Sequence, residues 1–210
     1  ALNAAFLEVN RQAKAKKILG GSTGCAVLFV NNMAYIANAG DCRAVLHLNG
    51  EAKAITKDHK PEDADEEKRI RKLGGEVVTT VGRDGKIIGR VNGILGVSRA
   101  FGDFELEPYI TCQPDIYEFE YTSDDSDDDF LIIACDGVWD VMSSEEATRI
   151  ALPFIKDHKL EAASRRIRDV AFARTSLDNI SVMVIKPLSQ AEKNAVRKTQ
   201  RSGFSLCAIV

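Results

Sequence analysis

The sequence predicts an α+β fold in which antiparallel β-sheets are covered by α-helices. Apolar runs typical of strands occur in groups that short turns separate, whereas the helical patterns come in blocks of their own. This order lacks the strict alternation of strand and helix that builds a parallel sheet. With 210 residues, of which 45% are hydrophobic and 28% are charged, the chain suits one globular domain.

Short apolar runs account for the predicted strands, and residues that tolerate tight turns separate several of them. Asn31–Asn32, Asn49–Gly50 and Asp84–Gly85 are such turns, and each predicts a hairpin. The runs predicted as strands are 25–30, 33–40, 42–48, 51–56, 76–81, 86–91, 93–98, 130–135 and 180–185.

Helical patterns occur at the start of the chain and in its second half. The first begins near Leu2, where apolar residues recur at helical spacing. Segment 61–75 starts with acidic residues and ends with basic ones, which suits the dipole of a helix. Ser143, followed three residues later by Glu146, predicts a capped helix start, and 160–173 carries one apolar face.

Composition argues against several classes of protein. The formal net charge of −3 gives no broad basic surface for nucleic acid. No apolar stretch approaches the roughly 20 residues that span a bilayer, and a secretory pattern is missing, so we expect a cytoplasmic or nuclear protein. The five cysteines contain no C-x-x-C pair and suggest neither zinc nor disulfides. Because the sequence starts at Ala1 without methionine, we expect a piece of a longer protein.

Four aspartates lie where apolar runs meet turns. Asp41 and Asp136 each follow a predicted strand, Asp178 precedes one, and Asp140 lies one helical turn after Asp136. If these ends converge, their charges repel, and a divalent cation is the natural compensation. Oxygen ligands favour magnesium or manganese over zinc. The alternative for each aspartate is an ordinary turn or cap residue.

Six motifs carry a resemblance to a known family. They are GSTG (21–24), ANAGDCRAV (37–45), DHKP (58–61), VNGILGVSRAFGD (91–103), FLIIACDGVWDVM (130–142) and DNISVMVI (178–185). Their order resembles that of the metal-dependent protein phosphatases of type 2C, which remove phosphate from phosphoserine and phosphothreonine. The resemblance implies two packed antiparallel β-sheets flanked by α-helices, an α-β-β-α sandwich that is truncated at its N-terminus.

The resemblance also implies a site without a side-chain nucleophile, where metal ions activate a water. Asp136 and Asp178 match carboxylates of a paired Mg or Mn centre, and Asp41 and Asp140 match those of a third, looser metal position. Two or more ions are expected in the complete domain, with a phosphoprotein as substrate and a monomeric enzyme. Further matching positions are interpreted as structural, namely Thr23, Gly96, Arg99, Gly102 and Asp103.

Half of the expected site is missing from these 210 residues. The family's Asp-Gly-His-Gly-Gly stretch, whose aspartate bridges the metals, is not found. Either it lies upstream of this chain, which alone would then be almost inactive, or the protein is a non-catalytic pseudophosphatase that acts as a binding module. The run 131–141 also resembles haloacid-dehalogenase phosphatases, but Ala134 occupies the position of their nucleophilic aspartate. None of the five cysteines precedes an arginine at the spacing of a cysteine phosphatase.

The phosphatase-like region is expected over residues 1–188, followed by a polar, basic tail over 189–210. The tail ends in CAIV, which has the form of a prenylation box at Cys207. Four basic residues precede it and could assist attachment to an anionic membrane: Lys193, Arg197, Lys198 and Arg201. The alternatives are a chance cysteine in a tail without structure, or packing of 204–210 onto the domain.

Overall fold

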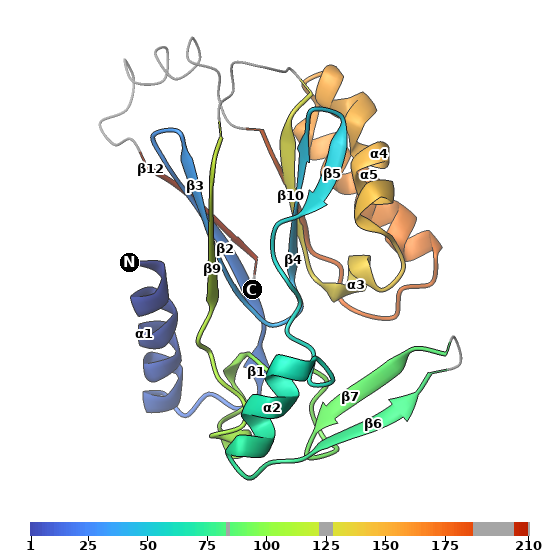
Figure 1. Cartoon of the computed structure of the whole chain (residues 1–210). Coiled ribbons are helices and arrows are strands. Elements are labelled where there is room, and N and C mark those ends of the chain that lie inside the picture. Colours follow the sequence, from blue (N-terminus) through green and yellow to red (C-terminus); the bar gives the residue numbers. More distant parts are fainter. Residues whose placement is uncertain (83–84, 122–127, 187–203, 210) are drawn as a thin grey trace.

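The structure, a computed structural model, describes residues 1–82, 85–121 and 128–186, and the backbone of 204–209. Two four-stranded antiparallel sheets pack together, and helices flank them on both outer sides (Figure 1), which confirms the predicted α-β-β-α sandwich. The helices are α1 (Leu2–Ala15), α2 (Ala64–Lys72), α3 (Asp136–Trp139), α4 (Ser144–Lys156) and α5 (Leu160–Ala173), with a 3-10 turn at Phe104–Leu106.

The strands build four antiparallel sheets. The first large sheet has the order β12-β2-β3-β9, the second has the order β11-β10-β4-β5, and β1-β8 and β6-β7 are two-stranded. Their bounds are β1 Gly21–Ser22, β2 Gly24–Val30, β3 Met33–Ala39, β4 Arg43–Leu48, β5 Glu51–Ala54, β6 Val77–Val81, β7 Ile87–Val91, β8 Phe101–Gly102, β9 Asp115–Glu120, β10 Phe130–Ala134, β11 Val182–Ile185 and β12 Phe204–Ile209.

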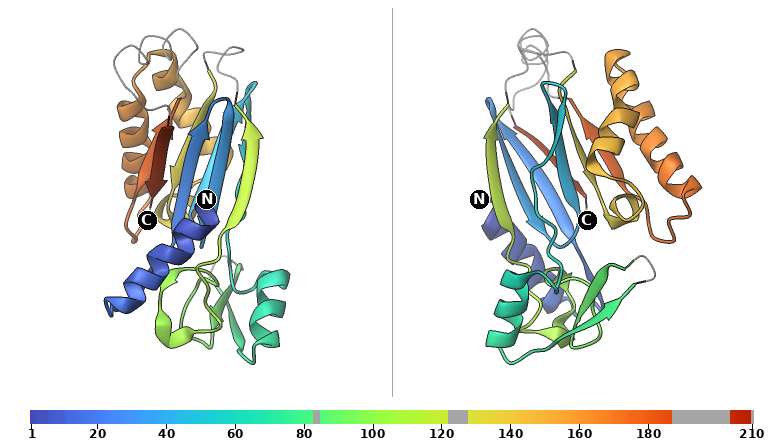
Figure 2. Two further views of the ribbon diagram at one scale, coloured as in Figure 1. Left: turned by 90° about the vertical axis from the view of Figure 1, so that its left-hand side faces the viewer. Right: turned by 45° about the vertical axis from the view of Figure 1, so that its right-hand side comes forward.

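The core lies between the two large sheets, which Figure 2 shows from two further directions. Because side chains alternate along a strand, β2 and β3 point Val27 and Ile36 toward Leu131 and Ile133 of β10. All four side chains are fully buried. β10 is therefore buried on both faces, which explains why its sequence is an uninterrupted apolar run.

Helices close the two outer faces. On the first sheet, Phe6 of α1 packs against Ala26 and Ala37, small residues that let the helix approach. On the second sheet, the buried faces of α4 and α5 cover Phe130 and Ile132. The predicted cap is present at the start of α4, where Ser143 Oγ accepts a hydrogen bond from the backbone N–H of Glu146 at 3.2 Å.

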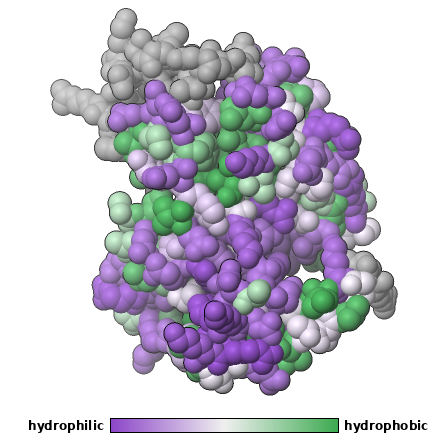
Figure 3. Space-filling model, viewed as in Figure 1, coloured by the Kyte–Doolittle hydropathy of each residue, from purple (hydrophilic) through white to green (hydrophobic). Residues whose placement is uncertain are grey.

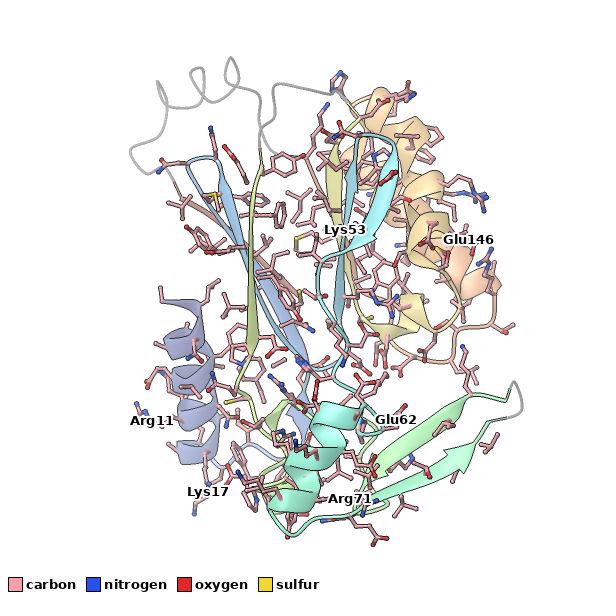
Figure 4. The ribbon with its side chains drawn as sticks, viewed as in Figure 1. Arg11, Lys17, Lys53, Glu62, Arg71 and Glu146 are labelled. Carbon is pink, nitrogen blue, oxygen red and sulfur yellow. The ribbon has the colours of Figure 1, made fainter. Side chains whose placement is uncertain are left out.

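Helix α2 and the β6–β7 hairpin form a smaller layer below the two sheets (Figure 1). Ile70 of α2 packs with Val77 and Val91 of the hairpin in a small apolar cluster of its own. Glu62, labelled in Figure 4 where the chain enters α2, accepts a hydrogen bond from the backbone N–H of Gly89 at 3.0 Å. Val81 and Ile87 of the hairpin are exposed. Figure 3 shows a group of hydrophobic residues at the lower right of the surface.

Three local predictions were wrong or incomplete. Segment 93–98 is not a strand, because Asn92 and Gly93 both adopt positive φ and turn the chain sharply after β7. Helix α2 begins at Ala64, with Asp63 as its N-cap, so the predicted start at residue 61 was too early. Strand β9 was not predicted, because acidic residues alternate with its apolar ones and every side chain is at least partly exposed.

Near the C-terminus, the backbone of β12 pairs antiparallel with β2, and Cys207 lies opposite Val27. This position agrees with the alternative in which the end of the tail packs onto the domain. The four basic residues of the tail lie outside the described residues, and lipidation of Cys207 stays a prediction. Among the described residues, no helix is both long enough and apolar enough to cross a bilayer.

Candidate functional site

Strand register brings the predicted aspartates to one end of the second sheet. On the central strand β10, Ala134 is paired with Arg43 of β4 on one side and with Val182 of β11 on the other. Asp136 follows Ala134, Asp41 precedes Arg43, and Asp178 precedes Val182. Because the neighbours of β10 run antiparallel to it, all three turns lie at the same edge.

Asp136 opens the single-turn helix α3, which folds back onto the strand before it. The indole of Trp139 donates a hydrogen bond from Nε1 to the carbonyl of Ala134 at 2.8 Å, and Val138 is fully buried. With that face turned inward, Asp136 lies half-buried at the start of the turn and Asp140 is exposed at its end. One turn of helix therefore places two carboxylates on the same side of the sheet edge.

The loop of Asp178 is attached to the start of α3 by short-range contacts. The thiol of Cys135 donates to the carbonyl of Asn179 at 3.0 Å and accepts from the backbone N–H of Ser181 at 3.1 Å. Close approach also requires Gly137, since a Cβ there would lie 2.2 Å from the carbonyl oxygen of Asn179. That Cβ would be only 3.5 Å from the Cβ of Asp178, so the loop and α3 are in contact.

Asp41 is held by a different device, a network of side chains around the turn before β4. The imidazole of His59 accepts at Nδ1 from the backbone N–H of Gly40 at 3.1 Å, and its Nε2 contacts Asp115 at 3.1 Å. Arg99 in turn donates to Asp115 at 2.7 Å. Gly40 has φ +109°, and a Cβ there would collide with a neighbouring side chain. The carboxylate of Asp41 is consequently fixed and nearly buried, with 5% of its side chain exposed.

Burial and neighbouring charges change the ionisation of Asp136 and Asp140. Burial raises the pKa of Asp136 from 3.8 to about 6, and repulsion by Asp41, Asp178 and Asp140 adds to the rise, whereas Lys60 opposes it. Partial loss of hydration likewise raises the pKa of Asp140, against the attraction of Lys60. Such mutual repulsion requires proximity. It agrees with the strand register and with the contact between α3 and the Asp178 loop, which bring the four predicted aspartates to one edge of the sheet.

An open groove of about 400 Å³ lies beside Asp140. Arg43 and Lys86 contribute positive charge to its lining, so it combines both signs of charge next to the carboxylates. Arg43 is held by a two-pronged ion pair with Asp58, at 3.0 and 2.7 Å, and lies over the ring of Trp139. A larger hollow of about 520 Å³ runs along β5 and α4, but none of the four aspartates lines it.

Sequence patterns did not single out Lys60, although it lies inside the DHKP motif. Its ammonium Nζ is 2.5 Å from Oδ2 of Asp41. Nothing in a linear sequence couples residues 41 and 60, because the pair depends on how His59 docks on the turn at Gly40. The available signal was weak: a lysine next to a histidine in a loop between a strand and a helix.

With this geometry described, comparison with known proteins decides the family. The family model for Protein phosphatase 2C matches residues 1–180. This chain belongs to the protein phosphatase 2C family. Probable protein phosphatase 2C 7 of Oryza sativa subsp. japonica is 42% identical over 87% of this chain. Probable protein phosphatase 2C 76 of Arabidopsis thaliana is 40% identical over 79% of it. The phosphatase 2C chain described here spans 45% and 37% of the lengths of these two relatives.

Solved structures agree on the fold of this phosphatase 2C chain. A sex determining protein of C. elegans superposes with a TM-score of 0.72 at 27% identity, over 87% of this chain and 44% of that one. Serine-threonine phosphatase 2C of Toxoplasma gondii gives a TM-score of 0.70 at 25% identity, over 86% of this chain and 63% of that one.

The four aspartates suit a hard divalent cation chemically. Their donors are oxygens, and repulsion by the neighbouring carboxylates adds to the rise that burial causes in the pKa of Asp136. Within the described ranges, however, no group of three or more His, Cys, Asp or Glu side chains is arranged to hold a metal ion. The fit is therefore one of ligand type and charge, and complete coordination needs rotation of these side chains or ligands from outside the described residues.

Proposed function

We propose that this chain is part of an enzyme that hydrolyses phosphoserine and phosphothreonine in proteins with the help of Mg²⁺ or Mn²⁺. The observation that carries the proposal is the convergence of Asp41, Asp136, Asp140 and Asp178 at one edge of the sheet. Burial, with repulsion by the other three aspartates, raises the pKa of Asp136 to about 6. Membership in the phosphatase 2C family supports it. Crowded carboxylates at a sheet edge are disfavoured unless a cation is bound there.

Each aspartate receives a role in this proposal. Asp136 and Asp178 would hold a pair of ions, and Asp41 and Asp140 a third that is bound more loosely. Bound divalent ions supply positive charge for phosphate oxygens and a water of lowered pKa. The chain itself positions the carboxylates through the close contact at Gly137, and its groove beside Asp140 would admit a segment of a phosphoprotein. No side chain serves as a nucleophile.

Metal binding can be tested on the 210-residue chain itself. Calorimetric titration with Mn²⁺ should give heat for the wild type, and Asp178→Asn should lose most of it because a ligand is removed. The matched control is Asp169→Asn on the exposed surface of α5, where the carboxylate pairs with Arg168. Equal Mn²⁺ binding in Asp178→Asn and wild type would contradict the assignment.

Activity needs a second test, because the Asp-Gly-His stretch is missing from this sequence. The 210 residues alone should hydrolyse p-nitrophenyl phosphate very slowly. A longer chain with that stretch upstream should be active with Mn²⁺ and inactive after addition of a chelator. Full activity of the 210 residues would refute the account of a divided site. A longer chain with a substituted aspartate, inactive but able to bind a phosphoprotein, would support the pseudophosphatase alternative.

We also propose that the mature protein is monomeric, and that Cys207 is a candidate for prenylation. The chemical signal is the terminal CAIV with basic residues upstream. Mass spectrometry of protein isolated from its own cells tests the modification directly. A mass without a prenyl adduct at Cys207 would remove membrane attachment by this route.

One relative from Oryza sativa subsp. japonica, 40% identical over 79% of this chain, has "mitochondrial" in its name.

A further inference from the structure

Lys60 places a cation directly among the carboxylates of the candidate metal site. Its ammonium binds Asp41 at 2.5 Å, with 32% of the lysine side chain and 5% of the aspartate side chain exposed. Backbone hydrogen bonds on either side of Lys60 fix its position. The backbone N–H of His59 donates to the carbonyl of Gly40 at 3.0 Å, and the carbonyl of Lys60 accepts from Asp63 at 3.1 Å.

The influence of Lys60 extends beyond its ion-pair partner. It opposes the rise that burial and the neighbouring carboxylates cause in the pKa of both Asp136 and Asp140. Burial alone would lower the pKa of Lys60, but the charge of Asp41 and its hydrogen bond, with further help from Asp140 and Asp136, raise it. The geometry agrees, because the ammonium of Lys60 and the carboxylate of Asp41 form an ion pair at 2.5 Å.

An ammonium and a divalent ion compete for the same oxygen of Asp41. Lysine has three N–H donors and no lone pair once protonated, so it cannot join a metal's coordination shell. It would also repel any cation that arrived within a few ångströms. Its four-carbon stem is flexible and partly exposed, which gives the ammonium a path toward solvent.

We propose that Lys60 is a resident counter-cation, which neutralises Asp41 in the metal-free protein and must move away before a divalent ion can bind at Asp41 and Asp140. The inference rests on the proposed function, since it assumes that these aspartates bind metal. Lys60 is then a positioning residue. It contacts Asp41, a proposed metal ligand, and it contacts neither the substrate nor the reacting atoms. The consequence is that binding at Asp41 and Asp140 is weaker than at Asp136 and Asp178.

The test is a calorimetric titration of Mn²⁺ into the 210-residue wild type and into Lys60→Met. Removing the charge should tighten the weaker class of Mn²⁺ sites by about tenfold, as expected for one unit charge a few ångströms away in a partly hydrated site. The matched control is Lys57→Met. Lys57 lies in the same loop but pairs with Asp63 at 3.0 Å and is exposed, so its loss should leave Mn²⁺ affinity unchanged.

Thermal unfolding gives a second readout that a purely structural lysine would not produce. Without metal, Lys60→Met should melt below the wild type, because Asp41 is left buried and unpaired. Saturating Mn²⁺ should restore its melting temperature, since the ion replaces the lost charge. If Lys60→Met fails to fold, Lys60→Gln retains a hydrogen-bond donor for Asp41 and should show the same gain in affinity.

Unchanged or weaker Mn²⁺ binding in both Lys60 variants would overturn the inference, as would a lower melting temperature that Mn²⁺ does not restore. Either result, together with normal Mn²⁺ binding by the wild type, would leave the proposed metal site standing. If the wild type itself binds no Mn²⁺, the proposed metal site fails, and the role of Lys60 fails with it.

Discussion

Two junctions bring the aspartates together, and they are built differently. At the Asp136–Asp178 junction, residues 135–137 touch 176–181 through neutral hydrogen bonds and a glycine contact. At the Asp41–Lys60 junction, residues 40–41 touch 58–60 through a histidine and an ion pair. Among the described residues, Asp136 and Asp178 form no ion pair, whereas Asp41 has one.

The two junctions differ in how their negative charge is compensated, which would make the proposed cation sites unequal. Neutral hydrogen bonds hold Asp136 and Asp178 together without an ion pair to either of them, so this junction would gain most if a cation bound. A lysine compensates the charge in advance, so an arriving ion gains less. Close contacts hold both junctions, but the negative charge that has no ion-pair partner differs between them. Substitutions at each junction can test this difference.

The largest effect is expected from Gly137→Ala. Its Cβ would lie 2.2 Å from the backbone oxygen of Asn179, so α3 and the Asp178 loop must separate. We expect a loss of about 2 to 4 kcal/mol in the free energy of unfolding, measured by urea denaturation. Gly96→Ala is the control, because the nearest atom to its Cβ is 3.9 Å away. Equal stability of the two variants would mean that the loop and α3 are not held in contact.

Glu66→Gln should weaken the other junction. Glu66 binds Arg99 at 2.6 Å, and Arg99 supports Asp115, which contacts His59. The loss should be about 2 to 3 kcal/mol at pH 7, because the partly buried Arg99 loses one of its charged partners. Urea denaturation measures it, and Glu67→Gln on the exposed face of α2, paired with Arg71, should change stability by less than about 0.5 kcal/mol.

The stability difference between wild type and Glu66→Gln should depend on pH. Burial raises the pKa of Glu66, but hydrogen bonds from Arg99 and Arg69 lower it from 4.5 to about 2. A depressed carboxyl pKa stabilises the folded state above pH 4.5 and loses that effect as the pH falls toward 2. The difference in unfolding free energy between wild type and Glu66→Gln should therefore shrink as the pH falls from 4.5 toward 2. A gap that stays constant would contradict the role of the Glu66 charge.

Asp136→Asn should stabilise the metal-free protein. Its pKa is raised from 3.8 to about 6, so the ionised form opposes folding above pH 6, and this penalty disappears as the pH falls toward 4. We expect a gain of about 1 to 2 kcal/mol at pH 7.5, reduced for partial solvent screening, and almost none at pH 4. Chelator-treated samples unfolded in urea at both pH values measure it. A loss of stability at pH 7.5 would mean that the carboxylates do not repel one another.

The smallest effect is expected from Cys135→Ala. This change removes the sulfur that bridges Asn179 and Ser181, and it should cost about 1 kcal/mol in unfolding free energy. Cys135→Ser keeps a donor and an acceptor at nearly the same place and should lose less. If the serine variant were the less stable of the two, packing of the sulfur and not its hydrogen bonds would hold the loop.

Local patterns were enough to predict most of the elements and the four aspartates. Burial imposes period 2 on strands and period 3.6 on helices, and these periods can be read over a few residues. A carboxylate directly after a buried run, such as Asp136 after 130–135, is likewise a local signal. The same reasoning failed at β9 and at 93–98, where alternating charge concealed one strand and the turn at Asn92–Gly93 interrupted another apolar run.

Contacts between distant turns required the tertiary structure. The register of Ala134 with Arg43 and Val182 decides that Asp136, Asp41 and Asp178 share one edge, and no short stretch of sequence encodes that register. The ion pair of Lys60 with Asp41 depends further on the docking of His59. Residue type therefore determined which side chains could bind a cation, and strand pairing decided which of them meet, because electrostatic forces depend on distance in space and not on separation along the chain.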